Sequence, residues 1–126
     1  MRAIDTNVLV RLLLRDDAAQ ARAADRWVTV GVWVPVLAVA EAAWVLTSVY
    51  GRSATALGAA VQMLLDHQHI TLQDREVIEA ALVTFGGKPA VSFTDAILLE
   101  LARRSGNLPL GTFDRNLGRR DGAEKL

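Results

Sequence analysis

Four acidic side chains of this 126-residue chain lie beside strongly apolar stretches. Asp5 ends the apolar run at the N-terminus, and Glu41 is the only charged residue between positions 26 and 52. Asp95 precedes an apolar helical segment, and Asp114 follows another apolar segment. Burying an isolated carboxylate costs several kcal/mol unless it is paired or bound to a cation. The pattern therefore predicts that the four meet around Mg²⁺ or Mn²⁺, which suits metal-dependent chemistry on a phosphate.

Asp5 is followed by two further polar residues, Thr6 and Asn7, at a predicted junction between a strand and a helix. All three residue types are favoured as helix N-caps, so capping is the structural interpretation. One cap needs only one such residue, which leaves a function for the others. In the chemical interpretation Asp5 binds metal, and Thr6 and Asn7 hold its carboxylate or bind a metal-bound water.

The other three carboxylates also have structural alternatives. Glu41 has no basic residue three or four positions away, and it could simply face solvent on a surface helix. Thr94 or Asp95 could cap the helix that follows, and an aspartate after a strand, such as Asp114, is often a turn residue. The chemical interpretation rests on the four together more than on any one of them.

Hydrophobic periodicity predicts alternating strands and helices. The predicted strands are Met1–Asp5, part of the alternating stretch Val28–Val36, Ile70–Leu72, Leu108–Phe113 and an edge strand at the C-terminus. The predicted helices are Asn7–Arg15, Asp16–Val28, Leu37–Tyr50, a helix capped by Ser53, Asp74–Phe85 and Asp95–Ser105, with a loop at Lys88–Thr94. This alternation predicts an α/β sandwich with a mostly parallel sheet, built as one domain over residues 1–126.

The predicted topology gives the carboxylates a common location. Ligands of such sheets bind beyond the carboxyl ends of the strands. Asp5 and Asp114 each end a predicted strand, while Glu41 and Asp95 belong to helices that begin near that edge. The spacing is therefore compatible with one shared site.

The composition of the chain limits its expected partners and cellular compartment. The chain has 14 basic and 14 acidic residues and no cysteine, so it is not a polyanion-binding protein by overall charge, and it suits a reducing cytoplasm. Hydrophobic residues make up 52% of the chain, an excess that suggests apolar surface for a partner or second subunit. The apolar stretch Trp27–Tyr50 is interrupted by Gly31, Pro35 and Glu41, so we expect two buried elements and no membrane span. No signal peptide is visible at the N-terminus.

The aromatic and histidine residues offer no competing site. Trp27, Trp33 and Trp44 are expected in the core or in an interface. His67 and His69 have no metal-binding or catalytic partners nearby in the sequence, and we expect them in a loop or at the surface.

Several segments together resemble the PIN-domain ribonucleases, and more closely the VapC-type toxins of bacterial toxin–antitoxin pairs. The segments are Met1–Asn7 with the apolar helix after it, Glu41–Gly51, Phe93–Leu101 and Thr112–Asn116. The resemblance covers the whole chain, and four motifs in this order are more specific than any one alone. It implies a three-layer α/β/α sandwich with a central, mostly parallel sheet of four or five strands.

The resemblance also assigns roles to residues. Asp5, Glu41, Asp95 and Asp114 match the family's acidic quartet, which binds Mg²⁺ or Mn²⁺, and Thr6 and Thr112 match its supporting hydroxyls. Many relatives carry another acid shortly before the third carboxylate, where this chain has Ser92, and this departure puts a second metal site in doubt. The implied activity is endonucleolytic cleavage of RNA, and the implied partners are a cognate antitoxin and a second copy in a homodimer. We expect the RNA phosphates to contact the C-terminal arginines Arg103, Arg104, Arg115, Arg119 and Arg120.

Three alternatives remain open from the sequence. A phosphoaspartyl enzyme would also place an aspartate after the first strand, but one such class needs a second aspartate where Asn7 stands, and Lys88 and Lys125 are the only lysines. A non-catalytic or regulatory PIN-like module would keep the carboxylates without turnover. A PIN nuclease acting on DNA, or in RNA processing outside toxin–antitoxin biology, would share the chemistry and differ in substrate.

Overall fold

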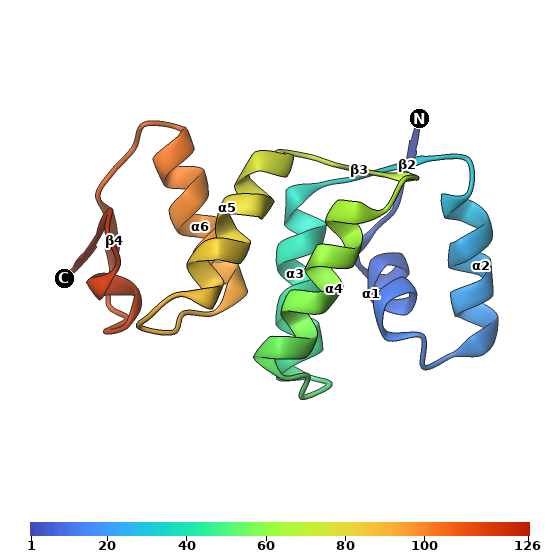
Figure 1. The fold of residues 1–126 in the computed structure, drawn as a ribbon, viewed down its shortest axis with the longest axis horizontal. Coiled ribbons are helices and arrows are strands. Elements are labelled where there is room, and N and C mark those ends of the chain that lie inside the picture. The colour runs from blue at the N-terminus through green and yellow to red at the C-terminus, as the bar shows by residue number, and fades with distance from the viewer. The chain divides into compact units, whose positions relative to one another are not determined.

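A computed structural model describes all residues from 1 to 126 (Figure 1). The chain forms two compact units, residues Met1–Arg75 and Glu76–Leu126. Asp5 and Glu41 belong to the first unit, and Asp95 and Asp114 belong to the second.

The first unit alternates short strands with longer helices. Its elements are β1 (Arg2–Ala3), α1 (Thr6–Leu14), α2 (Ala18–Val28), β2 (Val32–Val34), α3 (Val36–Ser48), α4 (Ala54–Asp66) and β3 (Ile70–Leu72). The three strands form a parallel sheet in the order β1-β2-β3. Parallel neighbours need crossover connections, and the helices supply them.

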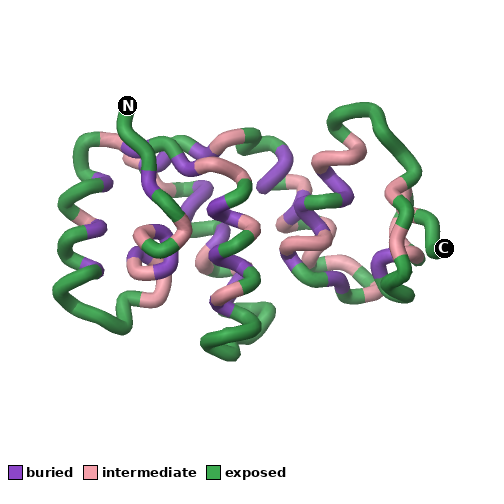
Figure 2. Tube along the Cα trace, turned by 180° about the vertical axis from the view of Figure 1, so that it is seen from behind, coloured by how far each residue is buried: buried purple, intermediate pink, exposed green.

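The core of this unit lies between the central strand and the helices. Val32 and Val34 of β2 are fully buried while Trp33 between them is exposed, the alternation expected of a strand. Helix α1 packs against both α2 and α3, and Leu9 on α1 is completely buried. Figure 2 shows this buried interior running through the facing sides of the helices. Through α1 and α3, the packing holds the segments that carry Asp5 and Glu41.

The second unit contains α5 (Arg75–Gly86), α6 (Phe93–Arg104), β4 (Leu110–Thr112), the short 3₁₀ helix η1 (Leu117–Arg119) and β5 (Ala123–Lys125). Strands β4 and β5 pair in parallel, with Leu110 opposite Ala123. The rings of Phe85 and Phe93 meet edge to face at 5.5 Å between centroids. Gly106, just after α6, has φ +77°, a conformation that favours glycine at the end of a helix.

The α/β class with parallel strands is confirmed. The strands number five, but hydrogen bonds join them as a sheet of three and a sheet of two, where one central sheet was expected. Each strand has only two or three residues, and hydrophobic alternation over so few positions does not specify which strands pair.

The predicted helices and strands are present, and helix caps and helix ends decide their boundaries. The alternating stretch Val28–Val36 forms a strand only over Val32–Val34, because α2 extends to Val28 and Pro35 is the N-cap of α3. The cap predicted at Ser53 is present, since Ser53 Oγ accepts a hydrogen bond from the Ala56 amide at 3.1 Å. No helix is long and apolar enough to cross a membrane.

The aromatic expectations are met in part. Trp27, Trp33 and Trp44 are 43%, 37% and 57% exposed, so none of them belongs to the core. Their location in an interface with a partner stays a prediction. His67 and His69 lie between α4 and β3, in the loop where the sequence places them. Their rings meet edge to face, and His67 Nδ1 accepts a hydrogen bond from the His69 amide.

Candidate functional site

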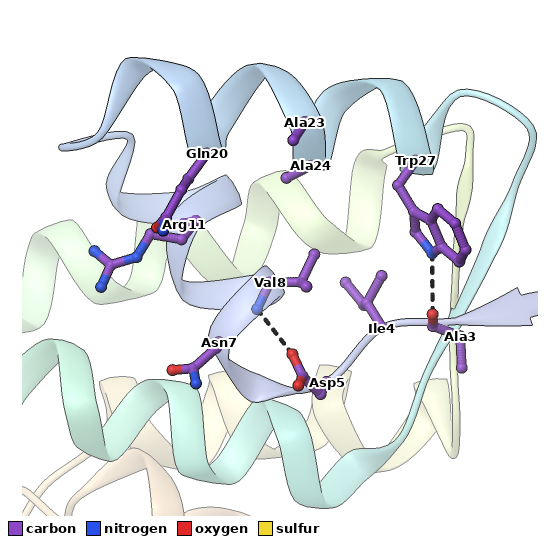
Figure 3. Close-up of a pocket in the computed structure, with 10 residues that line it drawn as sticks. All are labelled: Ala3, Ile4, Asp5, Asn7, Val8, Arg11, Gln20, Ala23, Ala24 and Trp27. Atoms are coloured by element: carbon purple, nitrogen blue, oxygen red, sulfur yellow. Dashed lines mark hydrogen bonds between the residues drawn. The ribbon is translucent and has the colours of Figure 1, made fainter.

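Asp5 stands between β1 and α1 and is exposed. Its Oδ1 accepts a hydrogen bond from the Val8 amide at 3.0 Å, which makes it the N-cap of α1 (Figure 3). The interpretation of Asp5 as a helix N-cap is therefore correct. The other carboxylate oxygen accepts no hydrogen bond from the protein, so capping leaves one oxygen of Asp5 for a ligand.

Thr6 connects the start of α1 to Glu41 on α3. Its Oγ1 donates to Glu41 Oε1 at 3.2 Å, across 35 positions of sequence. Thr6 was expected to support Asp5, and its hydroxyl instead orients the second carboxylate of the same unit. The packing of α1 on α3 thus brings Asp5, Thr6 and Glu41 into one neighbourhood.

Asp95 occupies the first turn of α6 and is half-buried. The N-cap of this helix is Ser92, whose Oγ accepts a hydrogen bond from the Asp95 amide at 3.1 Å. Neither Thr94 nor Asp95 is the cap, so that structural alternative is wrong. Ser92 therefore has a local role as the helix cap, and the Asp95 carboxylate is free of capping.

Asp114 follows β4 and shapes the turn that leads into η1. Its Oδ1 accepts a hydrogen bond from the Leu117 amide at 2.7 Å, and its own amide donates to Thr112 Oγ1 at 3.0 Å. The turn interpretation of Asp114 is therefore correct, and Thr112 holds its backbone. As with Asp5, the second carboxylate oxygen accepts no hydrogen bond from the protein.

None of the four carboxylates is buried, so the burial expected from their apolar neighbours in sequence is wrong. Asp5, Glu41 and Asp114 are exposed and Asp95 is only partly buried. Apolar neighbours in sequence turn toward the core, while Asp5 and Asp114 face outward at a helix start and a turn and Glu41 faces outward from within α3. Desolvation therefore does not require a cation here, and only the chemistry of the donor atoms favours one.

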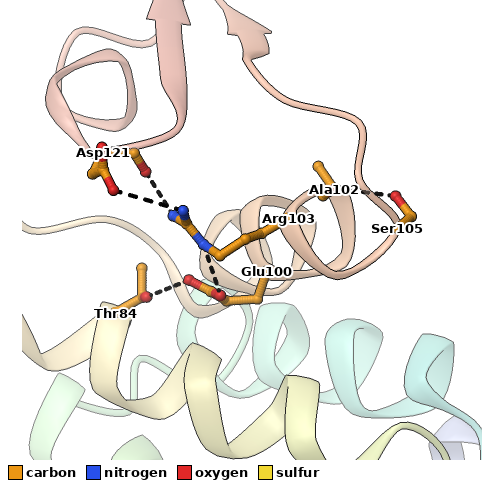
Figure 4. A network of polar contacts seen from close by, with 6 residues as sticks. All are labelled: Thr84, Glu100, Ala102, Arg103, Ser105 and Asp121. Atoms are coloured by element: carbon orange, nitrogen blue, oxygen red, sulfur yellow. Dashed lines mark hydrogen bonds and ion pairs between the residues drawn. The ribbon is translucent and has the colours of Figure 1, made fainter.

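The one buried charged residue is Glu100, which is 8% exposed and was not among the predicted site residues. It continues the buried stripe of Phe93, Ala96 and Ile97 along α6, at helical spacing. That stripe was the sequence signal for its burial. Glu100 accepts a hydrogen bond from Thr84 Oγ1 at 2.8 Å and from Arg103 Nε at 3.3 Å (Figure 4).

Arg103 extends this network to the C-terminal segment. Its Nη2 donates to the backbone carbonyl of Asp121 at 2.7 Å, and its Nη1 lies 3.7 Å from the Asp121 carboxylate (Figure 4). Gly122 permits the close approach, because a Cβ there would lie 3.0 Å from Arg103 Nη2. The network ties α5, α6 and the residues before β5 together, so Arg103 serves the fold.

The five arginines expected to bind RNA phosphates fall into two groups. Three of them already have partners within the protein. Arg103 binds Glu100 and Asp121, Arg120 donates to the Pro89 carbonyl at 2.7 Å, and Arg104 lies 3.7 Å from Glu76 in an exposed pair. Arg115 and Arg119 are exposed and enter no ion pair. Only these last two have guanidinium groups wholly available to a phosphate.

The donor atoms suit a hard divalent cation in kind. Carboxylate and hydroxyl oxygens are what Mg²⁺ and Mn²⁺ prefer, and Asp5, Glu41, Asp95 and Asp114 each keep at least one oxygen that no protein group occupies. The structure gathers no group of three or more acidic, histidine or cysteine side chains that could hold a metal ion. The residues therefore fit the cation by chemistry, without a preformed cluster.

Fold and site together define a small α/β protein with exposed or half-buried carboxylates near the starts of its helices and in one turn after a strand. The sequence matches the PIN domain family over residues 3–123, which covers both compact units. The chain belongs to the PIN domain family, whose members are commonly nucleases. No curated protein and no solved structure matches the chain.

Proposed function

We propose that this chain is a metal-dependent endoribonuclease and the toxin of a type II toxin–antitoxin pair, acting in the cytoplasm. The observation that carries the proposal is the PIN match over residues 3–123. Within that span, the four carboxylates of the expected quartet each keep a free oxygen. The resemblance to VapC-type toxins supports the finer assignment.

In this proposal the four carboxylates hold Mg²⁺ or Mn²⁺. A bound divalent cation lowers the pKa of its water and neutralises charge on the phosphate, which is the chemistry that phosphodiester hydrolysis needs. The chain's own groups position the ligands: the helix cap fixes Asp5, Thr6 orients Glu41, and the turn with Thr112 fixes Asp114. Asn7, which lines a cavity together with Asp5, is available to bind water or substrate nearby.

RNA binding rests on the two free arginines in the second unit. Arg115 directly follows Asp114, and Arg119 ends η1. We propose that both contact phosphates, with an affinity that falls as salt is raised. Arg103, Arg104 and Arg120 contribute positive charge to the same unit, while their existing contacts hold them in place.

A cognate antitoxin and a second copy of the chain are the proposed protein partners. Helix α3 presents exposed apolar side chains on either side of Glu41, with Leu37 66% and Trp44 57% exposed. Covering such residues removes apolar area from water, which favours association. A partner on this face would also restrict access to Glu41, as an inhibitor must.

The deciding experiment is cleavage of pooled cellular RNA by the purified protein with Mg²⁺, with Mn²⁺ and with EDTA. A double variant, Asp5→Asn with Asp95→Asn, runs in parallel. We expect metal-dependent cutting by the wild-type protein and none by the folded double variant. Equal cutting by both proteins, or cutting that persists in EDTA, would refute the proposed site.

A non-catalytic PIN-like module is the second candidate. It is favoured by Ser92, which stands where the family resemblance leads us to expect an acid. Metal binding by calorimetry without turnover on any RNA, from folded and antitoxin-free protein, would select it. Specific cleavage of DNA or of one precursor RNA would instead indicate a PIN nuclease outside toxin–antitoxin biology.

A further inference from the structure

A cavity of about 670 Å³ lies between α1 and α2 in the first unit and includes Asp5 in its lining. Its walls are small and apolar, with Ala23 and Ala24 on α2 facing Val8 and Ile4 (Figure 3). Arg11 and Gln20 lie at one end and Trp27 at the other (Figure 3). The volume falls within the roughly 300–1,000 Å³ of ordinary ligand pockets.

Some polar side chains of this cavity make hydrogen bonds within the protein, and others make none. Arg11 donates to both carboxylate oxygens of Asp16, at 2.7 and 3.0 Å, and the Trp27 indole N–H donates to the Ala3 carbonyl. The side chains of Gln20 and Asn7 make no hydrogen bond within the protein. Each free group is a neutral carboxamide, with two N–H donors and a carbonyl acceptor.

Apolar walls with free carboxamides suit a nucleobase better than a phosphate. Asparagine and glutamine side chains pair with base edges through one donor and one acceptor, and an unstacked base gains from apolar contact with both faces. A phosphate would need free positive charge, and the one arginine in the lining is neutralised by Asp16. The chemistry therefore selects the base over the backbone of a nucleic acid.

We propose that the cavity between α1 and α2 binds one base of the RNA beside the scissile phosphate and sets a base preference for cleavage. The inference rests on the proposed function, because Asp5 lines the cavity and is a proposed metal ligand. A base seated there places its own phosphate near Asp5. Gln20 then discriminates among bases through its free carboxamide.

The test fills the cavity without disturbing the fold. Ala23 is exposed on α2, so Ala23→Leu adds volume to the cavity wall from a position that tolerates a larger side chain. Ala19→Leu is the matched control, because Ala19 is exposed one turn away on the same helix and does not line the cavity. Gln20→Ala removes the free carboxamide and leaves the walls intact.

Cleavage sites in pooled RNA are mapped for the wild-type protein and the three variants. We expect the wild-type protein to prefer one base at one position beside the cut. The ratio of kcat/KM for the preferred base to that for the other bases should fall about tenfold in Ala23→Leu and in Gln20→Ala, and it should be unchanged in the control. An unchanged preference in both cavity variants would overturn the inference while leaving the nuclease intact. Unchanged cleavage combined with lost affinity for the antitoxin would assign the cavity to a protein partner and overturn it as well.

A second measurement separates this inference from the nuclease proposal. Single-stranded six-nucleotide homopolymers of A, C, G and U are titrated onto the wild-type protein in EDTA, where no metal-dependent cleavage occurs. We expect one homopolymer to bind most tightly and Ala23→Leu to abolish that preference. A preference that depends on Ala23, in a protein that cuts no RNA, would support the cavity and refute the nuclease. Equal binding of all four would refute the cavity's role whatever the outcome for cleavage.

Discussion

Asp5→Asn separates the two roles that the structure gives to Asp5. Asparagine is about as good an N-cap as aspartate, so its side-chain oxygen can still accept the Val8 amide hydrogen that Asp5 Oδ1 accepts at 3.0 Å. The negative charge that would bind a cation is lost. We therefore expect little change in the free energy of unfolding, within about 0.5 kcal/mol for the lost interaction with the helix dipole. We expect RNA cleavage to fall by more than about 100-fold, since even outer-shell changes cost metal sites about 10–100-fold.

The same chain supplies a matched control in Asp17→Asn. Asp17 caps α2 by accepting the Gln20 amide hydrogen at 3.0 Å, the same distance as at Asp5, and it is not a proposed ligand. Asp5→Ala completes the set, because it removes the cap as well as the charge. It should cost about 1 kcal/mol of stability. The melting temperature should then fall by roughly 3–5 °C.

The assays are thermal unfolding, Mn²⁺ binding by calorimetry, and metal-dependent cleavage of pooled RNA. Asp5→Asn and Asp5→Ala should lose activity equally and differ in stability, while Asp17→Asn should keep full activity. Full activity in Asp5→Asn would refute the assignment of Asp5 as a ligand. Loss of activity in Asp17→Asn would show that the assay responds to the loss of negative charge at a helix N-cap that is not a proposed ligand, and it would remove the basis of the comparison.

Three further predictions concern the charged residues. Arg103→Leu should lower the free energy of unfolding by about 3–5 kcal/mol in denaturant, because it leaves the buried Glu100 carboxylate without its cation. Arg103→Leu combined with Glu100→Leu should recover much of that loss. No recovery would show that the burial of Glu100 is not the cause. Arg115→Gln should weaken RNA binding and reduce the slope of log affinity against log salt by about one, and an unchanged slope would exclude a phosphate contact. The guanidinium of Arg15, through its hydrogen bonds, lowers the pKa of the Asp25 carboxyl. That pair therefore stabilises the fold above the ordinary aspartate pKa near 4, and the contribution is lost as pH falls through the lowered value. The difference in unfolding free energy between wild type and Arg15→Gln should be constant from about pH 5 to 7 and shrink below about pH 4. A difference that does not change with pH would mean that the pair does not act through ionisation.

Much of the local structure could be predicted from the sequence. Helical stripes, the cap at Ser53 and the strand Ile70–Leu72 all follow from interactions within a few positions along the chain. The placement of Asp5 and Asp114 just after strands is also local, and these two residues belong to the four motifs that together suggest the family that the PIN match shows. The roles of those carboxylates in binding metal stay predictions.

The burial of charged groups was not predictable from neighbouring residue types. Asp5 and Glu41 adjoin apolar sequence and face solvent, while Glu100 also stands among apolar residues and is buried. A helix has a buried and an exposed face, so position on the helix decides burial more than the composition of the segment. The stripe along α6 held that information for Glu100.

What the sequence by itself determined is the order of elements, some of the helix caps and the inventory of oxygen donors. Only the tertiary structure decided that Thr6 bonds Glu41, that Arg103 is committed to Glu100, and that a cavity opens beside Asp5. The reason is the range of the interactions. Caps and periodic stripes act within about one or two turns and leave a local pattern. A hydrogen bond across 35 positions depends on how whole helices pack, and no short stretch of sequence records it.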